Sequence, residues 1–98
     1  MIDKNTLEAR IEDKVYPKVT PEDLDDAIDS HKFISADSVT ICVITLNNGF
    51  TVTGINEGSV DPRNFDREIG EKMSYDLARS KLWPLLGFAL AEKLHKEI

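Results

Sequence analysis

The sequence predicts an α+β fold in which one antiparallel β-hairpin lies between helical segments. Residues 39–46 are dominated by β-branched side chains, and residues 50–55 form a second run of the same type. Between them, Asn48-Gly49 supplies the positive φ values that a tight hairpin turn needs. Apolar residues recur at helical spacing before and after the two runs, which predicts an N-terminal helix and a long C-terminal helix.

The first 19 residues are polar and carry few apolar positions. Leu7, Ile11 and Val15 recur every four residues, which predicts a weak amphipathic helix that Pro17 ends. We therefore expect residues 1–19 to form an arm that is loosely attached to a single domain spanning residues 1–98.

The next helix has a well-marked start. Thr20 is its candidate cap, Pro21 suits the first helical position, and the acidic residues that follow favour the positive end of the helix dipole. The pattern predicts a helix over residues 21–30 and an irregular link over residues 31–37. The acidic cluster at residues 22–26 is interpreted as a solvated helix face, with mimicry of nucleic-acid phosphates as the alternative.

The strand at residues 39–46 is mostly apolar on both of its faces. Such a strand is typical of a sheet covered on both sides, and a lone hairpin leaves its edges open. The helices can cover one face. Covering the other face, or closing an edge, would need a third strand or a second copy of the protein, so we expect a homo-oligomer. The candidate interface residues are Ile41, Val43, Leu86, Phe88 and Leu90.

The C-terminal helix is predicted to begin at Asp61-Pro62, with Asp61 as its cap. Gly70 within it predicts the close approach of another backbone, because a glycine otherwise weakens a helix. Pro84 removes one helical hydrogen bond and disfavours helical geometry at Trp83. We expect this helix to be kinked or broken near Trp83-Pro84.

Composition narrows the classes of function. The chain has 98 residues with 18 acidic and 12 basic side chains, which gives a net charge of −6. Because binding of nucleic acid over a broad face needs clustered bases, we expect no such binding. No apolar run approaches the roughly 18 residues of a membrane span, and the N-terminus lacks the pattern of a signal peptide. We therefore expect no membrane association.

No catalytic, metal or cofactor site is expected. Cys42 lies alone in an apolar run, which predicts a buried thiol, and His31 and His95 lack the spacing of metal ligands. Both histidines lie near predicted helix ends, where a cation suits the dipole, with ligand contact as the alternative for His31. No nucleophile–base set or phosphate-binding loop is present, which favours a non-enzymatic protein.

The candidate ligand-binding residues are Arg63, Asn64, Asp66 and Trp83. A helix N-terminus attracts anions, and Arg63 is suited to clamp a phosphate or a carboxylate there. A simple helix cap is the alternative interpretation of residues 61–66. Trp83 is either a stacking platform for a ligand or a residue of the core or of an oligomer interface.

Three segments of the chain resemble a known protein family. They are residues 45–54 (TLNNGFTVTG), 60–70 (VDPRNFDREIG) and 82–88 (LWPLLGF), taken in this order and spacing. Over about half of its length the chain is thus similar to the small tailed-bacteriophage proteins of the gene forty-nine / gene sixty-six type. The resemblance implies a phage protein made in the cytoplasm of a host bacterium, and it implies no activity.

Three hypotheses of function follow, with an enzyme ranked below the first two. The first is a phage-encoded accessory protein that binds and modulates a host component, with anti-phage defence among the targets considered. The second is an oligomeric small-molecule binder that sequesters a nucleotide signal. The third is a minor virion or assembly protein.

Overall fold

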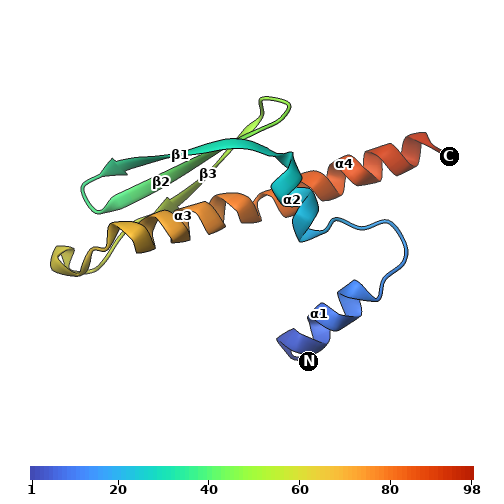
Figure 1. Cartoon of the computed structure of the whole chain (residues 1–98), viewed down its shortest axis with the longest axis horizontal. Helices are drawn as coiled ribbons and strands as arrows, with labels where there is room; N and C mark the ends of the chain where they lie inside the picture. The colour runs from blue at the N-terminus through green and yellow to red at the C-terminus, as the bar shows by residue number, and fades with distance from the viewer.

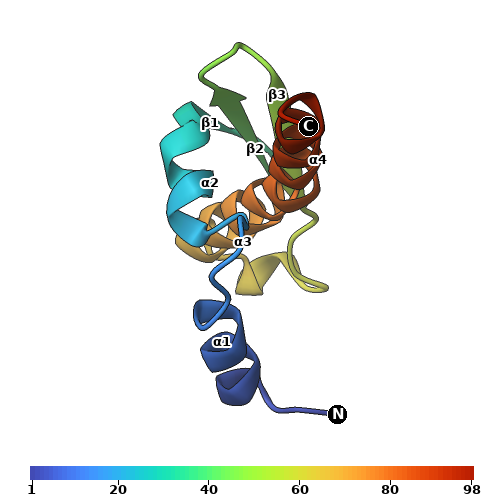
Figure 2. The same ribbon diagram turned by 90° about the vertical axis from the view of Figure 1, so that its right-hand side faces the viewer.

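The computed structural model describes residues 1–98 and confirms the α+β fold (Figure 1). Its elements in chain order are α1 (Lys4–Glu12), α2 (Pro21–Ala27), β1 (Ile28–Ala36), β2 (Val39–Leu46), β3 (Thr51–Asn56), the 3-10 turn η1 (Pro62–Asn64), α3 (Arg67–Ser80) and α4 (Leu82–Lys96). Helix α3 lies along one face of the sheet, and α4 runs on beyond it. Helix α1 stands apart from the rest of the chain in both views (Figures 1 and 2).

The predicted hairpin is confirmed as the pair β2 and β3, with the second strand one residue later than expected. The N–H of Leu46 donates to the carbonyl of Phe50 at 2.8 Å, which leaves a three-residue loop. Gly49 in that loop has a φ of 87°, a conformation that favours glycine. This is the three-residue form of the hairpin, a turn followed by a left-handed residue.

A third strand lies where an irregular link over residues 31–37 was expected, and the helix before it ends three residues early. Strand β1 pairs antiparallel with β2, so the sheet order is β1-β2-β3. Helix α2 stops at Ala27 because Asn47 of the hairpin turn takes its last carbonyls. The Asn47 side chain donates to Asp26 O at 2.7 Å, and its N–H donates to Ala27 O at 3.0 Å.

Helix α3 packs against β2 and β3 through its smallest residues, Gly70, Ser74 and Ala78. The close backbone approach is at Gly54 of β3, where a Cβ would lie 2.1 Å from Ser74 O. The expectation of a backbone approach at Gly70 is wrong, because the nearest atom there is the Thr40 hydroxyl oxygen. The buried apolar residues of the core are Leu24, Cys42, Ile44, Leu46, Val52, Ala78 and Leu82.

The C-terminal helix begins later than predicted. Asp61 caps only the single turn η1, and Asp66 caps α3 by accepting from the N–H groups of Glu68 and Ile69. The expected interruption is present as a bend at Lys81 between α3 and α4. Pro84 is the third residue of α4, where its missing N–H has no helical partner to lose.

The sheet is covered on one face only. Along β2, residues 40, 42, 44 and 46 are buried beneath the helices, and the alternate residues are half-buried. Ile34, Ile41 and Ile55 stand side by side in register on the open face. Ile34 and Ile55 are exposed, so the apolar second face expected to be covered is uncovered in a single copy of the chain.

Candidate functional site

The turn at residues 61–66 is a self-contained set of polar contacts. An Arg63 guanidinium nitrogen lies 2.6 Å from Asp61 Oδ2, and its Nε lies 3.1 Å from Oδ1. This pair lowers the pKa of the Asp61 carboxyl and raises the pKa of Arg63. Because Asp61 already neutralises it, the guanidinium is not free to clamp an anion in this arrangement. Asn64 is exposed beside it, and Asp66 is engaged as the cap of α3.

Trp83 lies in a different place from the other candidate ligand residues. It lines a cavity of about 530 Å³ between the N-terminal arm and the start of α2, and no residue of the 61–66 turn lines that cavity. The volume is suited to a small molecule. Its full lining is Glu8, Ile11, Glu12, Lys18, Val19, Thr20, Pro21, Glu22 and Trp83. Three carboxylates against one ammonium disfavour a phosphate-bearing ligand there.

A second hollow, of about 320 Å³, lies between β1 and α3. The His31 ring makes edge contacts with Phe33 and Tyr75, at centroid distances of 5.4 Å and 5.1 Å. Glu71 and Lys72 complete the lining. Sequence reasoning missed this cluster because it assigned residues 31–37 to an irregular link, which hides that His31 and Phe33 share one face of a strand.

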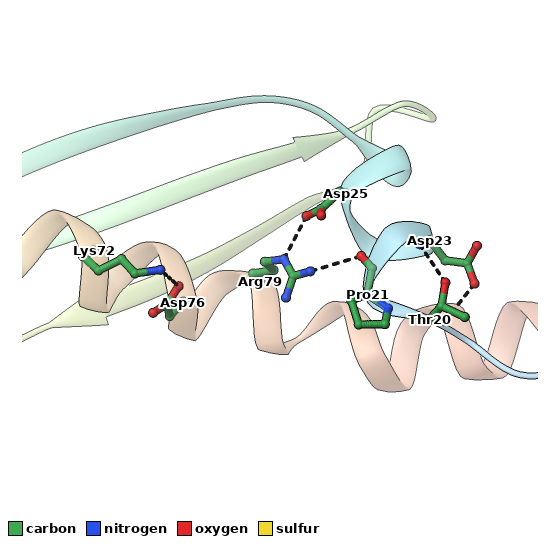
Figure 3. A network of polar contacts seen from close by, with 7 residues as sticks. All are labelled: Thr20, Pro21, Asp23, Asp25, Lys72, Asp76 and Arg79. Atoms are coloured by element: carbon green, nitrogen blue, oxygen red, sulfur yellow. Dashed lines mark hydrogen bonds and ion pairs between the residues drawn. The ribbon is translucent and has the colours of Figure 1, made fainter. Parts of the chain in front are cut away.

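Arg79 joins α3 to α2 (Figure 3). Its Nε lies 3.1 Å from Asp25 Oδ1, and a guanidinium nitrogen donates to Pro21 O at 3.1 Å. Thr20 caps α2 through a reciprocal pair of bonds with Asp23. Part of the acidic cluster is therefore used locally, in the cap and in the bridge to Arg79.

Large apolar side chains are exposed along both C-terminal helices. On α3, Ile69 is 57% exposed, Met73 49% and Leu77 47%. These residues follow the helical spacing recognised in the sequence, yet they do not contribute to the core. On α4, Phe88 is 69% exposed, and Trp83 and Leu85 are exposed as well.

The five candidate interface residues fall into two groups. Ile41 and Val43 are half-buried on the open face of the sheet. Leu86 and Leu90 are half-buried on α4, where Leu86 packs against the core, while Phe88 points to solvent. The two groups lie on different elements, the sheet and α4, and they do not form one continuous surface.

No set of three or more histidine, cysteine or acidic side chains is arranged to hold a metal ion. Cys42 is buried, and burial raises the pKa of its thiol. His95 is exposed in the last turn of α4. None of the helices combines the length and the apolar character needed to cross a bilayer.

Comparison with known proteins gives one match. The model of the phage protein (N4 Gp49/phage Sf6 gene 66) family matches residues 2–94. The match extends through the arm and β1, which precede the three segments that carry the sequence resemblance. No curated protein and no solved structure is significantly similar to the chain.

Proposed function

The chain belongs to this family of phage proteins, and from that premise we propose that it is a non-enzymatic accessory protein that binds and modulates a protein of the bacterial host. The observation that carries the proposal is the exposed apolar side of α4. We place the action in the host cytoplasm, with components of anti-phage defence as one class of target.

Helix α4 projects beyond the sheet and the other helices. It contacts α2 and α3, and its C-terminal part extends past the sheet (Figure 1). Leu85 and Phe88 are three residues apart, so they share one side of the helix. An exposed helix side of this kind is the form that a groove in a partner protein recognises through spaced apolar anchors. A solvated helix would carry polar side chains at these positions.

The nucleotide-sequestering alternative receives less support. The cavity beside Trp83 is lined by three glutamates and one lysine, and Arg63 is bound to Asp61 elsewhere in the chain. Neither place offers a free cation to a phosphate. A thermal-shift series with cyclic nucleotides is therefore expected to leave the unfolding midpoint unchanged, and a saturable rise would favour this alternative. The virion alternative predicts that the protein is detected by mass spectrometry in purified particles.

The test uses the full chain as bait in a lysate of the bacterium that the phage infects. We expect one defined host protein to be recovered by the wild-type chain, and at least tenfold less of it by Phe88→Asp. The matched control is Lys96→Gln, which makes the same change of −1 in net charge at another exposed position of α4 and is expected to stay within twofold of the wild type.

Two outcomes contradict the proposal. One is that the wild-type bait recovers only further copies of itself. The other is that Phe88→Asp and Lys96→Gln recover the host protein equally well, because α4 then does not carry the interaction.

A further inference from the structure

The outer edge of β3 has backbone groups that are not used within the chain. β3 is an edge strand of the sheet. Because Leu46 and Phe50 form a hydrogen-bonded pair, the pairs Ile44–Val52 and Cys42–Gly54 do so as well, by the alternation of antiparallel ladders. The N–H and C=O groups of residues 51, 53 and 55 therefore point away from β2. This row is a template for another strand.

An apolar stripe on α3 runs beside that edge. Leu77 approaches β3 directly, since its Cβ lies 3.0 Å from the position that a Cβ on Gly54 would take. Tyr75 is on the opposite flank of α3, against His31 of β1. Ile69, Met73 and Leu77 share one helix side at spacings of four residues, so all three lie on the β3 flank. They are each about half-exposed or more.

From these two features we infer that the chain forms a two-fold symmetric dimer, in which β3 pairs antiparallel with β3 of a second copy and the two α3 stripes pack against each other. The partner is thus a second copy of this chain. An antiparallel strand pair is self-complementary, which is what a two-fold interface requires. The result is one continuous six-stranded sheet with both α3 helices on the same face.

The layer spacing fits this arrangement. In the proposed dimer the axis of α3 is taken to lie over the space between β2 and β3, since α3 packs on both strands. Strands are about 4.8 Å apart, which places that axis about 2.4 Å inside β3. Pairing β3 with its copy then sets the two helix axes about 10 Å apart, the upper end of the spacing of packed helices. The two α3 helices can therefore pack against each other in the same dimer in which the two β3 strands pair.

The other edge of the sheet is unsuited to such pairing. β1 carries the charged residues Asp29 and Lys32, and charged side chains on an edge strand oppose pairing with another strand. β3 has no charged residue over its six positions. Helix α3 contacts β2 and β3 and offers no comparable apolar stripe beside β1. The choice of edge thus follows from charge as well as from the stripe.

The area of the proposed interface sets the expected affinity of the dimer. A six-residue strand is about 20 Å long, and two layers about 10 Å apart with their side chains give a face of similar depth. This is of order 400 Å² per copy, which is at the small end of specific interfaces. We therefore expect a reversible dimer that dissociates in the micromolar range.

Cross-linking tests the position of the two-fold axis. Cys42 is fully buried, so a cysteine introduced at the surface is the reactive thiol of the variant. Leu77→Cys is expected to yield at least ten times more disulfide-linked dimer under mild oxidation than Ser35→Cys, which lies on the β1 edge. Equal yields from the two variants would overturn the proposal, because they would mean random collision.

Sedimentation velocity over a micromolar concentration series tests the strand pairing. Thr53→Pro removes an N–H that points away from β2, and it is expected to raise the dimer dissociation constant at least tenfold. Ser35→Pro is the matched control, since its N–H points outward on β1 by the same alternation, and it is expected to stay within twofold of the wild type.

A second pair of variants acts through side chains alone. Met73→Glu on the stripe is expected to weaken the dimer at least tenfold. Lys72→Gln, which makes the same change of −1 in net charge next to it on another side of α3, is expected to change it less than twofold. A wild-type chain that stays monomeric at the highest concentration, or a stripe variant that dimerises normally, overturns the proposal. The host-binding proposal stands or falls separately, because it rests on α4.

Discussion

The two edges of the sheet differ in what they present to solvent. β1 carries Asp29, His31 and Lys32 and is joined to the helices by the aromatic contacts of Tyr75. β3 carries no charge and lies beside the exposed stripe of α3. Natural sheets place charges on edges that must not pair. The difference therefore indicates that the β1 edge is protected against pairing with another strand, whereas the β3 edge is free to pair.

The helix layer shows the same asymmetry. On the β1 side, α3 is tied to α2 by Arg79 and covered by polar or aromatic residues. On the β3 side, the contact is a close backbone approach at Gly54, and the larger apolar side chains face outward. Substitutions on the two sides should therefore have different consequences, and substitutions at the centre of the sheet and in the turn at residues 61–66 provide two points of reference.

The largest effect is expected from Gly54→Ala on the β3 side. A Cβ there would lie 2.1 Å from Ser74 O and 2.4 Å from Ala78 N, and these are backbone atoms that move only with the helix. Overpacking of this kind costs about 3 kcal/mol of unfolding free energy. Denaturant unfolding measures it, with Thr53→Ala on the same strand as the control. Equal stabilities of the two variants would show that α3 does not rest on β3 at Gly54.

The next effect is expected from Arg79→Ala on the β1 side. Arg79 is mostly buried and loses two hydrogen bonds, to Asp25 and to the carbonyl of Pro21. Because Asp25 is largely exposed, we discount the ion pair and expect a loss of about 1 to 1.5 kcal/mol. Arg67→Ala, in an exposed pair with Glu71, is expected to lose less than about 0.5 kcal/mol. If Arg79→Ala also loses less than about 0.5 kcal/mol of unfolding free energy, α2 is not held by this contact.

At the centre of the sheet, between the two sides, one substitution is expected to increase the stability of the fold. The Thr40 hydroxyl is buried beneath Gly70 and has no hydrogen-bond partner. Thr40→Val keeps the shape and removes the unpaired group, which is expected to raise the unfolding free energy by about 1 kcal/mol. Thermal unfolding of the variant against the wild type measures the change. A loss of stability would indicate that the hydroxyl is hydrogen-bonded in solution.

The smallest effect is expected in the turn that belongs to neither side. Arg63 lowers the pKa of the Asp61 carboxyl below its ordinary value of 3.8. A lowered pKa in the folded state stabilises the fold above the unfolded pKa, and this contribution is lost as the pH falls through the lowered value. Carboxyl titration by NMR is expected to show the Asp61 midpoint rising in Arg63→Gln. An unchanged midpoint would show that the pair is not formed in solution.

The parts of the fold that the sequence predicts are those with a local cause. The Asn48-Gly49 turn, the cap at Thr20 and the break before Pro84 each depend on a few neighbouring residues. Strand β1 was not predicted because its sequence has no apolar alternation. It becomes a strand by pairing with β2 and because Asn47, far along the chain, ends the helix before it.

The candidate site was harder to predict for a related reason. Helical spacing identifies Ile69, Met73 and Leu77 as one face, but spacing cannot say whether a face turns toward the core or away from it. That choice depends on Gly54, whose missing side chain lets the small residues of α3 approach the sheet. Arg63 and Trp83 were grouped by chemistry, whereas their separation in space depends on the whole path of the chain.

The packing of α3 on the sheet also limits which substitutions this protein can accept during evolution. Its inward positions, Gly70, Ser74 and Ala78, accept no larger residue without moving the helix. The exposed side of α4 carries no such limit, since Phe88 is 69% exposed and lies outside the core. Mutations can therefore accumulate on that side of α4 while the fold is kept. A lineage that meets a new partner can alter its recognition residues there one at a time, without passing through unfolded intermediates.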